Sequence, residues 1–195
     1  RVHSANGAGT ATSGDYTFTT LQEAPNGQIV IDGDFSDWQT VPVYAQDPLD
    51  AGGGSGDAKA LYVESGNGKL FVRLDVYGTF SMSTVNILYI DSDNTANTGY
   101  YGGGWPSFGA EYRIVYSNGF NPPKLQRFIG GSQGNDSWTD VTVLNGSYSG
   151  SSAEIEIPYG HIGLSQGATI KLLFRANQDA APDFWQQSKP SYILK

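Results

Sequence analysis

The stretch "LYVESGNGKLFVRLDVYG", residues 61–78, predicts a β-hairpin and with it the fold class. Two strand-like runs flank Gly66-Asn67-Gly68, and glycine and asparagine accept the positive φ that a tight hairpin turn needs. Because successive side chains of a strand point to opposite faces, the second run has one apolar face and one mixed face. The apolar face carries Leu70, Val72, Leu74 and Val76, and the mixed face carries Phe71, Arg73, Asp75 and Tyr77. We therefore expect a half-buried strand of an antiparallel sheet.

Further strand-like runs follow along the chain, each closed by Gly, Asn, Pro or Ser. They are "QIVIDGDFSDW" (28–38, a short strand and a turn), "VNILYI" (85–90), "EYRIVYS" (111–117), "KLQRFIG" (124–130), "DVTVL" (140–144), "AEIEIP" (153–158) and "TIKLLFRAN" (169–177). This regular spacing predicts an all-β fold, an antiparallel two-sheet β-sandwich that is jelly-roll-like, with about 8–12 strands. We expect a helical turn only at 158–165, and a mobile glycine-rich connection at 50–60.

Composition excludes several classes of protein. The 195 residues suffice for one sizeable domain. A net charge of -8 with 11 Lys and Arg argues against a nucleic-acid partner and favours cation binding. The chain has no cysteine and hence no disulfide framework. No run reaches the roughly 18 apolar residues of a membrane span, so we expect no membrane partner.

The first residues differ in character from the rest of the chain. "RVHSANGAGTATSGDYTFTT", residues 1–20, is interpreted as a strand end, a glycine-rich loop and a second strand with Tyr16 and Phe18. This pattern resembles the last hairpin of a fibronectin type III domain. The resemblance implies that 1–21 is the C-terminal hairpin of such a domain, that 22–27 is a linker, and that 28–195 is the main sandwich. Because the chain opens abruptly at Arg1, we expect a piece of a longer, multi-modular protein.

An acidic loop follows the predicted strand 85–90. "IDSDNTANTGYYGGGWPSFGAEY", residues 90–112, offers Asp91, Asp93, Asn94 and Asn97 as oxygen ligands, and Ca²⁺ takes six to eight oxygens from carboxylates, amides and carbonyls. It is not an EF-hand, because Gly102 stands where the bidentate glutamate should be and no helix flanks the loop. The alternative is an Asx-rich turn whose side chains cap their own backbone.

Several segments together resemble the family 9 carbohydrate-binding modules. They are "VIDGDFSDW", "LYIDSDNTANTGYY" followed by "AEYRIVY", "AEIEIPYGHIG" and "DFWQQSKPSYILK", in the same order over 28–195. The resemblance implies a calcium-containing β-sandwich that holds a terminal sugar ring between aromatic side chains. It places the calcium on Asp91, Asp93, Asn94 and Asn97, and one stacking ring at Trp185. The family's second stacking tryptophan has no counterpart, since "GTFSMST" (78–84) offers only Phe80.

The remaining aromatics offer ways to rebuild a sugar platform, because sugars pack their C–H faces on exposed rings beside polar groups. Trp105 follows three glycines that provide no side chains to bury it, so it is either a platform or a lid over the core edge. Trp185 is either a sugar contact or a core residue. Tyr100 and Tyr101 point to opposite faces if extended, so one is exposed. The predicted sugar-binding residues are Trp105, Trp185, Tyr100, Tyr101 and Asn86.

Catalysis has little support in the sequence. Glu154 and Glu156 share a strand face and so satisfy the minimum of two carboxylates for glycoside hydrolysis, but alternation with Ile155 and Ile157 explains them as a solvent face. His161 is interpreted as a turn residue, and no nucleophile or zinc motif is present. Two tryptophans remain: Trp38 is predicted to lie in the core, and Trp138 at a strand start.

The sequence therefore predicts a non-catalytic, calcium-stabilised carbohydrate-binding module of a secreted bacterial protein. It would bind an oligo- or polysaccharide and so target an attached catalytic module, with a fibronectin type III-like module as a further neighbour. The competing hypothesis is a structural or adhesive spacer that keeps the sandwich and the calcium but binds no sugar.

Overall fold

Strands dominate the computed structural model, which describes residues 3–6, 9–12, 29–101, 108–117, 120–177, 179–182 and 189–195. The described elements are β1 (His3–Asn6), β2 (Gly9–Thr12), η1 (Ser36–Trp38), β3 (Val43–Gln46), β4 (Ala58–Gly66), β5 (Lys69–Val76), β6 (Asn86–Asp91), β7 (Tyr112–Val115), β8 (Lys124–Phe128), β9 (Trp138–Val143), β10 (Asn145–Ser149), β11 (Ser152–Pro158), η2 (Tyr159–Ile162), β12 (Thr169–Ala176), β13 (Asp179–Ala181) and β14 (Ser191–Ile193). The prediction of an all-β fold is confirmed. None of the helices in these ranges is long and apolar enough to span a membrane.

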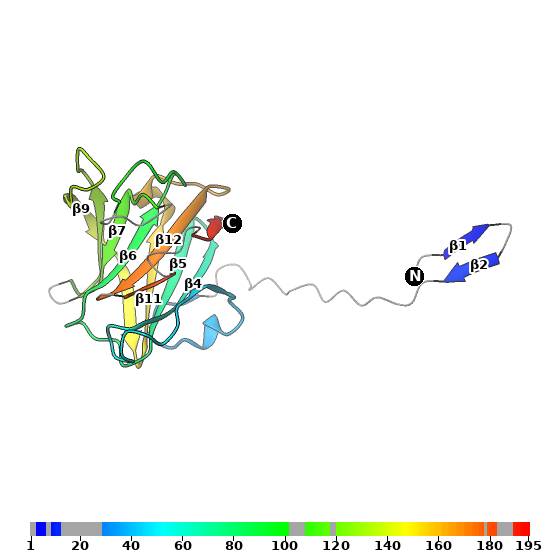
Figure 1. Cartoon of the computed structure of the whole chain (residues 1–195), viewed down its shortest axis with the longest axis horizontal. Helices are drawn as coiled ribbons and strands as arrows, with labels where there is room; N and C mark the ends of the chain where they lie inside the picture. Colours follow the sequence, from blue (N-terminus) through cyan, green and yellow to red (C-terminus); the bar gives the residue numbers. More distant parts are fainter. Residues whose placement is uncertain are drawn as a thin grey trace.

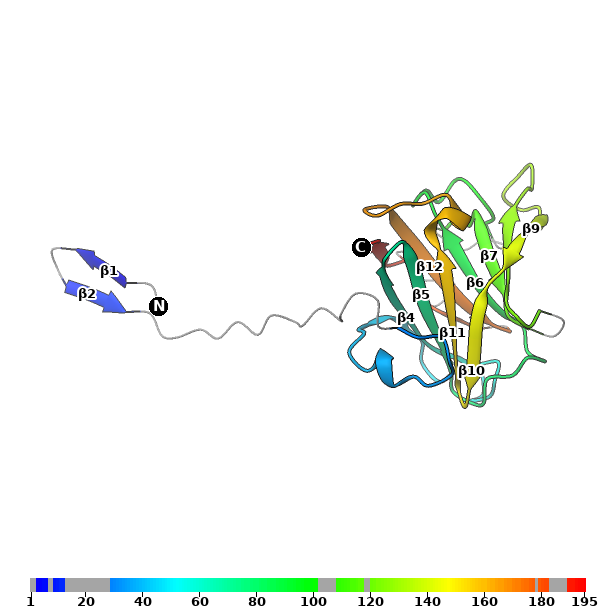
Figure 2. The same ribbon diagram turned by 180° about the vertical axis from the view of Figure 1, so that it is seen from behind.

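Two antiparallel sheets pack face to face. One sheet has the order β10-β11-β5-β4-β3, visible from behind in Figure 2. The other has the order β13-β12-β6-β7-β8-β9, with β14 also paired to β12. Figure 1 labels β12, β6, β7 and β9 of this sheet. Strands β13 and β14 share the free edge of β12, at Phe174–Ala176 and Thr169–Lys171 respectively. The predicted two-sheet sandwich is therefore present.

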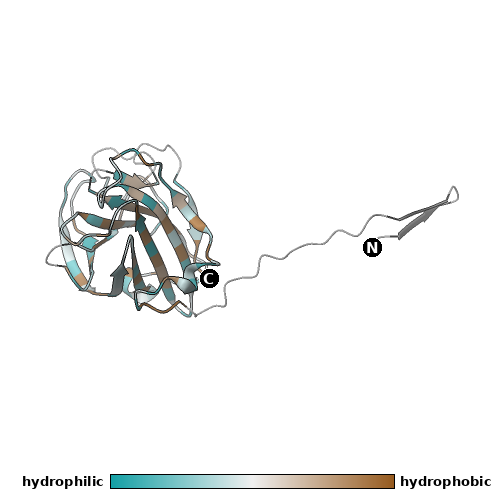
Figure 3. Ribbon diagram, turned by 90° about the horizontal axis from the view of Figure 1, so that it is seen from below, coloured by the Kyte–Doolittle hydropathy of each residue, from teal (hydrophilic) through white to brown (hydrophobic). Residues whose placement is uncertain are grey.

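The hairpin predicted at 61–78 joins β4 to β5. Asn67 (φ 52°) and Gly68 (φ 74°) both adopt positive φ, which matches the right-handed twist of the flanking strands. Gly66 pairs with Lys69 across the turn. The predicted apolar face, from Leu70 to Val76, is fully buried between the sheets. Figure 3 shows hydrophobic residues along the strands of the sandwich.

The helical turn predicted at 158–165 is also present. It forms η2, whose Tyr159 and Ile162 are buried in the main core. Gly163 (φ 67°) ends it in the left-handed conformation that glycine adopts without strain. His161 is exposed on this turn, as predicted.

The outer face of β5 is covered rather than exposed to solvent. Phe71 packs against Ile29, Trp38 and Val41, which form a second apolar cluster outside the five-stranded sheet. The short strand expected within 28–38 is wrong for the described residues 29–38, where the chain runs through bends into η1. The segment covers the sheet with its apolar side chains instead of pairing with it as a strand. Trp38 is 1% exposed, which confirms its prediction as a core residue.

Glu154 is buried beneath this covering segment. Its Oε1 accepts hydrogen bonds from the backbone N–H groups of Asp32 and Gly33, both at 2.7 Å, and its Oε2 accepts one from Trp38 Nε1 at 2.9 Å. The side chain has no exposed surface, so its assignment to a solvent face is wrong. Glu156 remains partly exposed and pairs with Lys69 at 2.9 Å. The two glutamates differ because residues 29–38 cover only one of them.

The glycine-rich connection at 50–60 is tied to the sandwich by hydrogen bonds. Gly53 N donates to Asp57 Oδ2 (2.6 Å), and the N–H groups of Asp57 and Gly78 both donate to the carbonyl of Gly54 (3.2 and 3.1 Å). The expectation of a mobile connection considered only side-chain burial. It missed that a buried carboxylate can hold glycine backbone in place.

The N-terminal residues form a hairpin of their own. β1 and β2 pair antiparallel, with His3 opposite Thr12 and Asn6 opposite Gly9. The second strand thus lies in the stretch interpreted as a glycine-rich loop. The strand expected around Tyr16 and Phe18, and the linker predicted at 22–27, lie outside the described residues.

Candidate metal centre

Three carboxylates meet where β6 ends and β7 begins. Asp91 is the last residue of β6 and Asp93 follows in the predicted acidic loop, while Glu111 precedes β7. One carboxylate oxygen from each lies within 4.8 Å of the other two. Asp91 has no exposed surface, Glu111 is partly buried, and Asp93 is exposed. The group can hold a metal ion.

The metal ligands predicted from the sequence did not include Glu111. It joins the group because β6 and β7 are antiparallel neighbours with Ile90 opposite Tyr112, which places Glu111 beside Asp91. Its backbone N–H donates to the Ile90 carbonyl at 3.1 Å. The available signal was an acidic residue directly before the next apolar strand, in "AEYRIVY".

Some of the carboxylate oxygens cap the loop backbone. Thr95 N donates to Asp91 Oδ1 (3.0 Å) and to Asp93 Oδ1 (2.9 Å), and the Thr98 hydroxyl also binds Asp93. Ser92 N donates to Glu111 Oε2 at 2.8 Å. The Asx-turn interpretation is therefore correct for part of the donor set. It does not account for the remaining oxygens.

Two buried oxygens of the group have no hydrogen-bond partner among the described residues. They are Asp91 Oδ2 and Glu111 Oε1. The nearest cation is Lys171 Nζ, 4.0 Å from Asp91 Oδ2 and thus at the limit of an ion pair. Burying an unpaired carboxylate oxygen costs free energy, and a bound cation removes that cost. These two oxygens are the feature that best fits a metal ion.

Burial and nearby negative charges raise the pKa values of Asp91 and Glu111. Burial, with the nearby charges of Glu111 and Asp93, raises the pKa of Asp91 to about 6, although Lys171 opposes the shift. Burial likewise raises the pKa of Glu111. Both carboxyls resist ionisation in the metal-free fold because burial disfavours their negative charge. A divalent cation would offset that charge and stabilise the ionised carboxylates.

The two predicted amide ligands lie in the same loop. Asn94 and Asn97 are both exposed. Asn94 adopts φ 55°, a left-handed conformation that asparagine accepts more readily than most residues. The turn of the backbone thus explains Asn94 by itself, and ligation by either amide stays a prediction.

The loop that starts at this centre returns over the outer face of the seven-stranded sheet. Tyr100 and Ala110 exchange two backbone hydrogen bonds (2.7 and 2.9 Å), which close the base of the segment between them. Phe108 and Ala110 are fully buried against Tyr89 of β6. The side chain of Gln133 also donates to the carbonyls of Ala96 and Thr98. The centre therefore lies next to the described ends of this loop, where Tyr100, Phe108 and Ala110 pack onto the sheet.

Gly99 allows the two sides of this loop to approach. It has φ 59°, and an added Cβ would lie 2.4 Å from Glu111 Oε1 and 2.6 Å from the Ala110 carbonyl oxygen. Gly99→Ala is expected to displace Glu111 and weaken the binding of a metal ion at this group at least about tenfold, which corresponds to about 1.4 kcal/mol. Calorimetric titration of chelator-treated protein measures this change.

A matched control for Gly99→Ala is Gly160→Ala. An added Cβ at the exposed Gly160 meets nothing within 4 Å, and its φ lies outside the left-handed range. Its affinity for the metal ion should equal that of the unmodified chain. Equal affinities for both variants would contradict the role assigned to the Gly99 contact.

The predicted sugar-binding tyrosines occupy different environments. Tyr101 is 38% exposed, whereas Tyr100 is partly buried and packs on Tyr89 (ring centroids 6.0 Å apart) and Trp138 (5.3 Å). The prediction that one of the two is exposed is confirmed for Tyr101. Trp138 opens β9 as predicted, with its ring in this cluster. Trp105 and Trp185 lie outside the described residues.

Asn86, predicted as a sugar-binding residue, is not exposed. It is fully buried, and its Nδ2 donates to the carbonyls of Ser81 (2.9 Å) and Thr84 (3.2 Å). Its contact with a surface sugar is therefore corrected to a structural role in the turn before β6. Phe80 is 3% exposed and packs against Tyr116 and Tyr148, so it provides no exposed ring in this region.

A shallow cleft of about 440 Å³ lies on the five-stranded sheet. It is lined by two half-buried rings, Tyr62 and Tyr77, with Gln46, Lys59, Asp47, Pro48 and Ala60 around them. Rings beside hydrogen-bonding side chains are what a sugar site requires. The sequence prediction did not include this surface.

Comparison with known proteins adds no relative. A scan against protein-family models matches none of them, and a search of curated proteins finds no match. The fold and the carboxylate group therefore rest on the structure itself.

Proposed function

We propose that the sandwich is a non-catalytic module that binds Ca²⁺ at Asp91, Asp93 and Glu111. The observation that carries this proposal is a pair of buried oxygens without a hydrogen-bond partner among the described residues, Asp91 Oδ2 at the end of β6 and Glu111 Oε1 just before β7. All three donors are carboxylates, and hard cations prefer oxygen ligands. Exposed Asp93 leaves room for water or the nearby amides to complete the coordination shell.

The donor set favours calcium over magnesium. Ca²⁺ accepts six to eight oxygen ligands in a flexible geometry, whereas Mg²⁺ demands a near-ideal octahedron. A group of three protein carboxylates, one of them exposed, suits the less demanding ion. Mg²⁺ would also have to lose tightly held water.

The cation would act mainly on the loop that it closes. By joining the end of β6 to the start of β7, it would fix both ends of the chain between Asp91 and Glu111. That stretch contains Tyr101, whose ring is 38% exposed, and in sequence it also contains Trp105. The metal would then support ligand binding indirectly, through the position of the loop.

We further propose that the ligand is an oligo- or polysaccharide. Support comes from the resemblance to family 9 carbohydrate-binding modules over 28–195, from the exposed ring of Tyr101, and from the cleft beside Tyr62 and Tyr77. In a secreted bacterial protein such a module would hold an attached enzyme on its polymeric substrate and raise its effective concentration. Glu154 supports a non-catalytic role, because both of its oxygens already accept structural hydrogen bonds.

The competing function is a structural spacer that binds calcium but no sugar. It is favoured by the burial of Asn86 and Phe80, because neither side chain is exposed to contact a sugar. It is favoured also by the packing of Tyr100 into an aromatic cluster. A binding measurement separates the two functions.

The test is isothermal titration calorimetry of the whole chain in calcium buffer. The panel includes glucose, xylose and fragments of cellulose, xylan and α-glucan. We expect saturable heat with at least one sugar, and loss of that heat in Trp185→Ala with nearly the same melting temperature. Tyr62→Ala serves as the comparison, because a loss of heat there instead would assign binding to the cleft.

Two results would contradict the carbohydrate proposal. Absence of heat across the panel, from protein shown to be folded, favours the spacer. A large drop in melting temperature for Trp185→Ala would identify Trp185 as a core residue rather than a sugar contact.

A further inference from the structure

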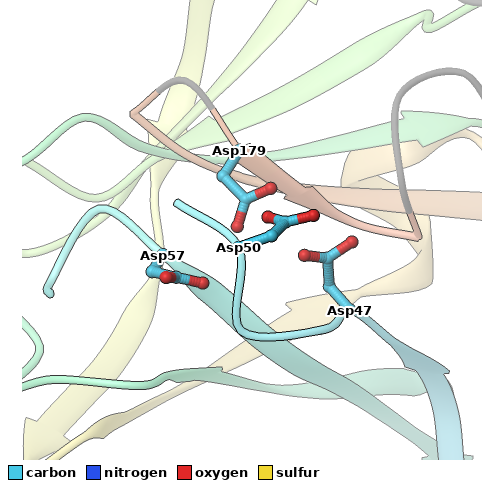
Figure 4. A group of neighbouring side chains, drawn as sticks. All are labelled: Asp47, Asp50, Asp57 and Asp179. Atoms are coloured by element: carbon cyan, nitrogen blue, oxygen red, sulfur yellow. The ribbon is translucent and has the colours of Figure 1, made fainter. Parts of the chain in front are cut away.

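Four aspartates converge at the other end of β6 from the candidate metal centre. Asp91 pairs with Lys171 near the start of β12, whereas the second group lies beyond Ala176 at its end, where β13 begins. The members of this group, shown in Figure 4, are Asp47, Asp50, Asp57 and Asp179. Five residues of extended strand separate the two ends, roughly 16 Å. The two acidic groups are therefore independent.

The four side chains come from two separate segments, the connection between β3 and β4 and the start of β13. Asp47 follows β3, Asp50 lies in the glycine-rich connection, Asp57 precedes β4, and Asp179 opens β13. One carboxylate oxygen from each lies within 4.8 Å of the other three. Asp57 has no exposed surface and Asp47 is 5% exposed, while Asp50 reaches solvent. A partly buried site with an open side results.

Asp57 provides the observation that points to a ligand. Its Oδ2 accepts a hydrogen bond from Gly53 N at 2.6 Å, but its Oδ1 is buried and has no hydrogen-bond partner among the described residues. Figure 4 shows this carboxylate among the other three. A fully buried, unpartnered carboxylate oxygen in an acidic group is costly unless a cation binds it.

Three of the four carboxylates are not neutralised by a protein cation in the described ranges. Asp50, Asp57 and Asp179 form no ion pair with any Lys, Arg or His in the described part of the chain. Burial, with the charges of Asp50 and Asp57, raises the pKa of Asp179. The fold nevertheless holds these carboxylates together, through backbone hydrogen bonds such as Ala58 N to Asp179 Oδ2 at 2.7 Å.

We propose that Asp47, Asp50, Asp57 and Asp179 form a second Ca²⁺ site. Four carboxylates supply at least four of the six to eight oxygens that Ca²⁺ takes, and Asp50 faces the solvent from which water can complete the shell. Ca²⁺ is favoured over Mg²⁺ because it accepts more oxygen ligands and a more flexible geometry. The absence of His and Cys disfavours zinc.

The second ion links the two sheets. Asp47 and Asp57 flank the connection between β3 and β4 of the five-stranded sheet, whereas Asp179 belongs to β13 of the seven-stranded sheet. The hydrogen bond from Ala58 N to Asp179 already joins the sheets at this point. A cation on all four carboxylates fastens the glycine-rich connection across the open end of the sandwich.

The test is the calcium stoichiometry of the whole chain, measured by calorimetric titration after removal of bound metal. We expect about two Ca²⁺ per chain. Asp50→Asn should remove one or weaken it at least about tenfold, and it is the mildest variant because Asp50 is exposed. Asp57→Asn should have the same effect, and Asp91→Asn should remove the ion of the first centre. Asp140→Asn is the control, because Asp140 is exposed and its loss should change neither ion.

The variants separate the two sites from each other. One ion that Asp91→Asn abolishes and Asp50→Asn leaves intact would overturn the second site and keep the first. One ion with the opposite pattern would establish the second site and refute the first. Titration without any calcium heat would overturn both.

Discussion

Replacing Glu154 by alanine is expected to lower the free energy of unfolding by at least about 3 kcal/mol. The change leaves three donors, Asp32 N, Gly33 N and Trp38 Nε1, without their shared acceptor under the covering segment. Each buried donor that loses its partner costs about 1–3 kcal/mol, and the removed side chain adds a cavity. Urea unfolding followed by tryptophan fluorescence measures the loss.

Glu156→Ala is the matched control on the same strand. Its side chain is 21% exposed and forms an ion pair with Lys69, so its loss should cost less than about 1 kcal/mol. Glu154→Gln keeps the volume but replaces one acceptor oxygen with a donor, and we expect it to be strongly destabilising too. If Glu154→Ala and Glu156→Ala cost the same, the assigned hydrogen-bond role of Glu154 is wrong.

Removal of calcium is expected to lower the melting temperature. A ligand at about 100 times its Kd stabilises the folded state by about 2.7 kcal/mol per site. For a domain of this size that energy corresponds to roughly 5–11 °C. Scanning calorimetry with calcium and with excess chelator measures the difference, and identical curves would contradict both proposed metal centres.

Asp91→Asn provides the control for the first centre. Because folding raises the pKa of Asp91 to about 6, its ionised form destabilises the metal-free fold above that pH, and the effect disappears as the pH falls below about 4, its unfolded value. In chelator at neutral pH the variant should therefore melt at or above the unmodified chain. In calcium it should melt below it, since it lacks one ion.

Local sequence signals were sufficient for the fold class and for part of the metal centre. Gly66-Asn67-Gly68 specifies a hairpin through backbone conformation alone, and the alternation from Leu70 to Val76 specifies a buried face. The acidic loop after β6 was located because Asp91 and Asp93 are close in sequence. In each case residues within one strand or turn carry the information.

Only the tertiary structure decided which surfaces are covered and which distant groups meet. Alternation placed Glu154 opposite an apolar face, but its burial depends on residues 32–38, more than a hundred positions away. Antiparallel pairing brought Glu111 to Asp91, and the meeting of two sheets brought Asp179 to Asp57. The sequence by itself determined where strands and turns form, because these depend on neighbouring residues. The packing of the sheets decided the sites, because their ligands come from strands far apart in the chain.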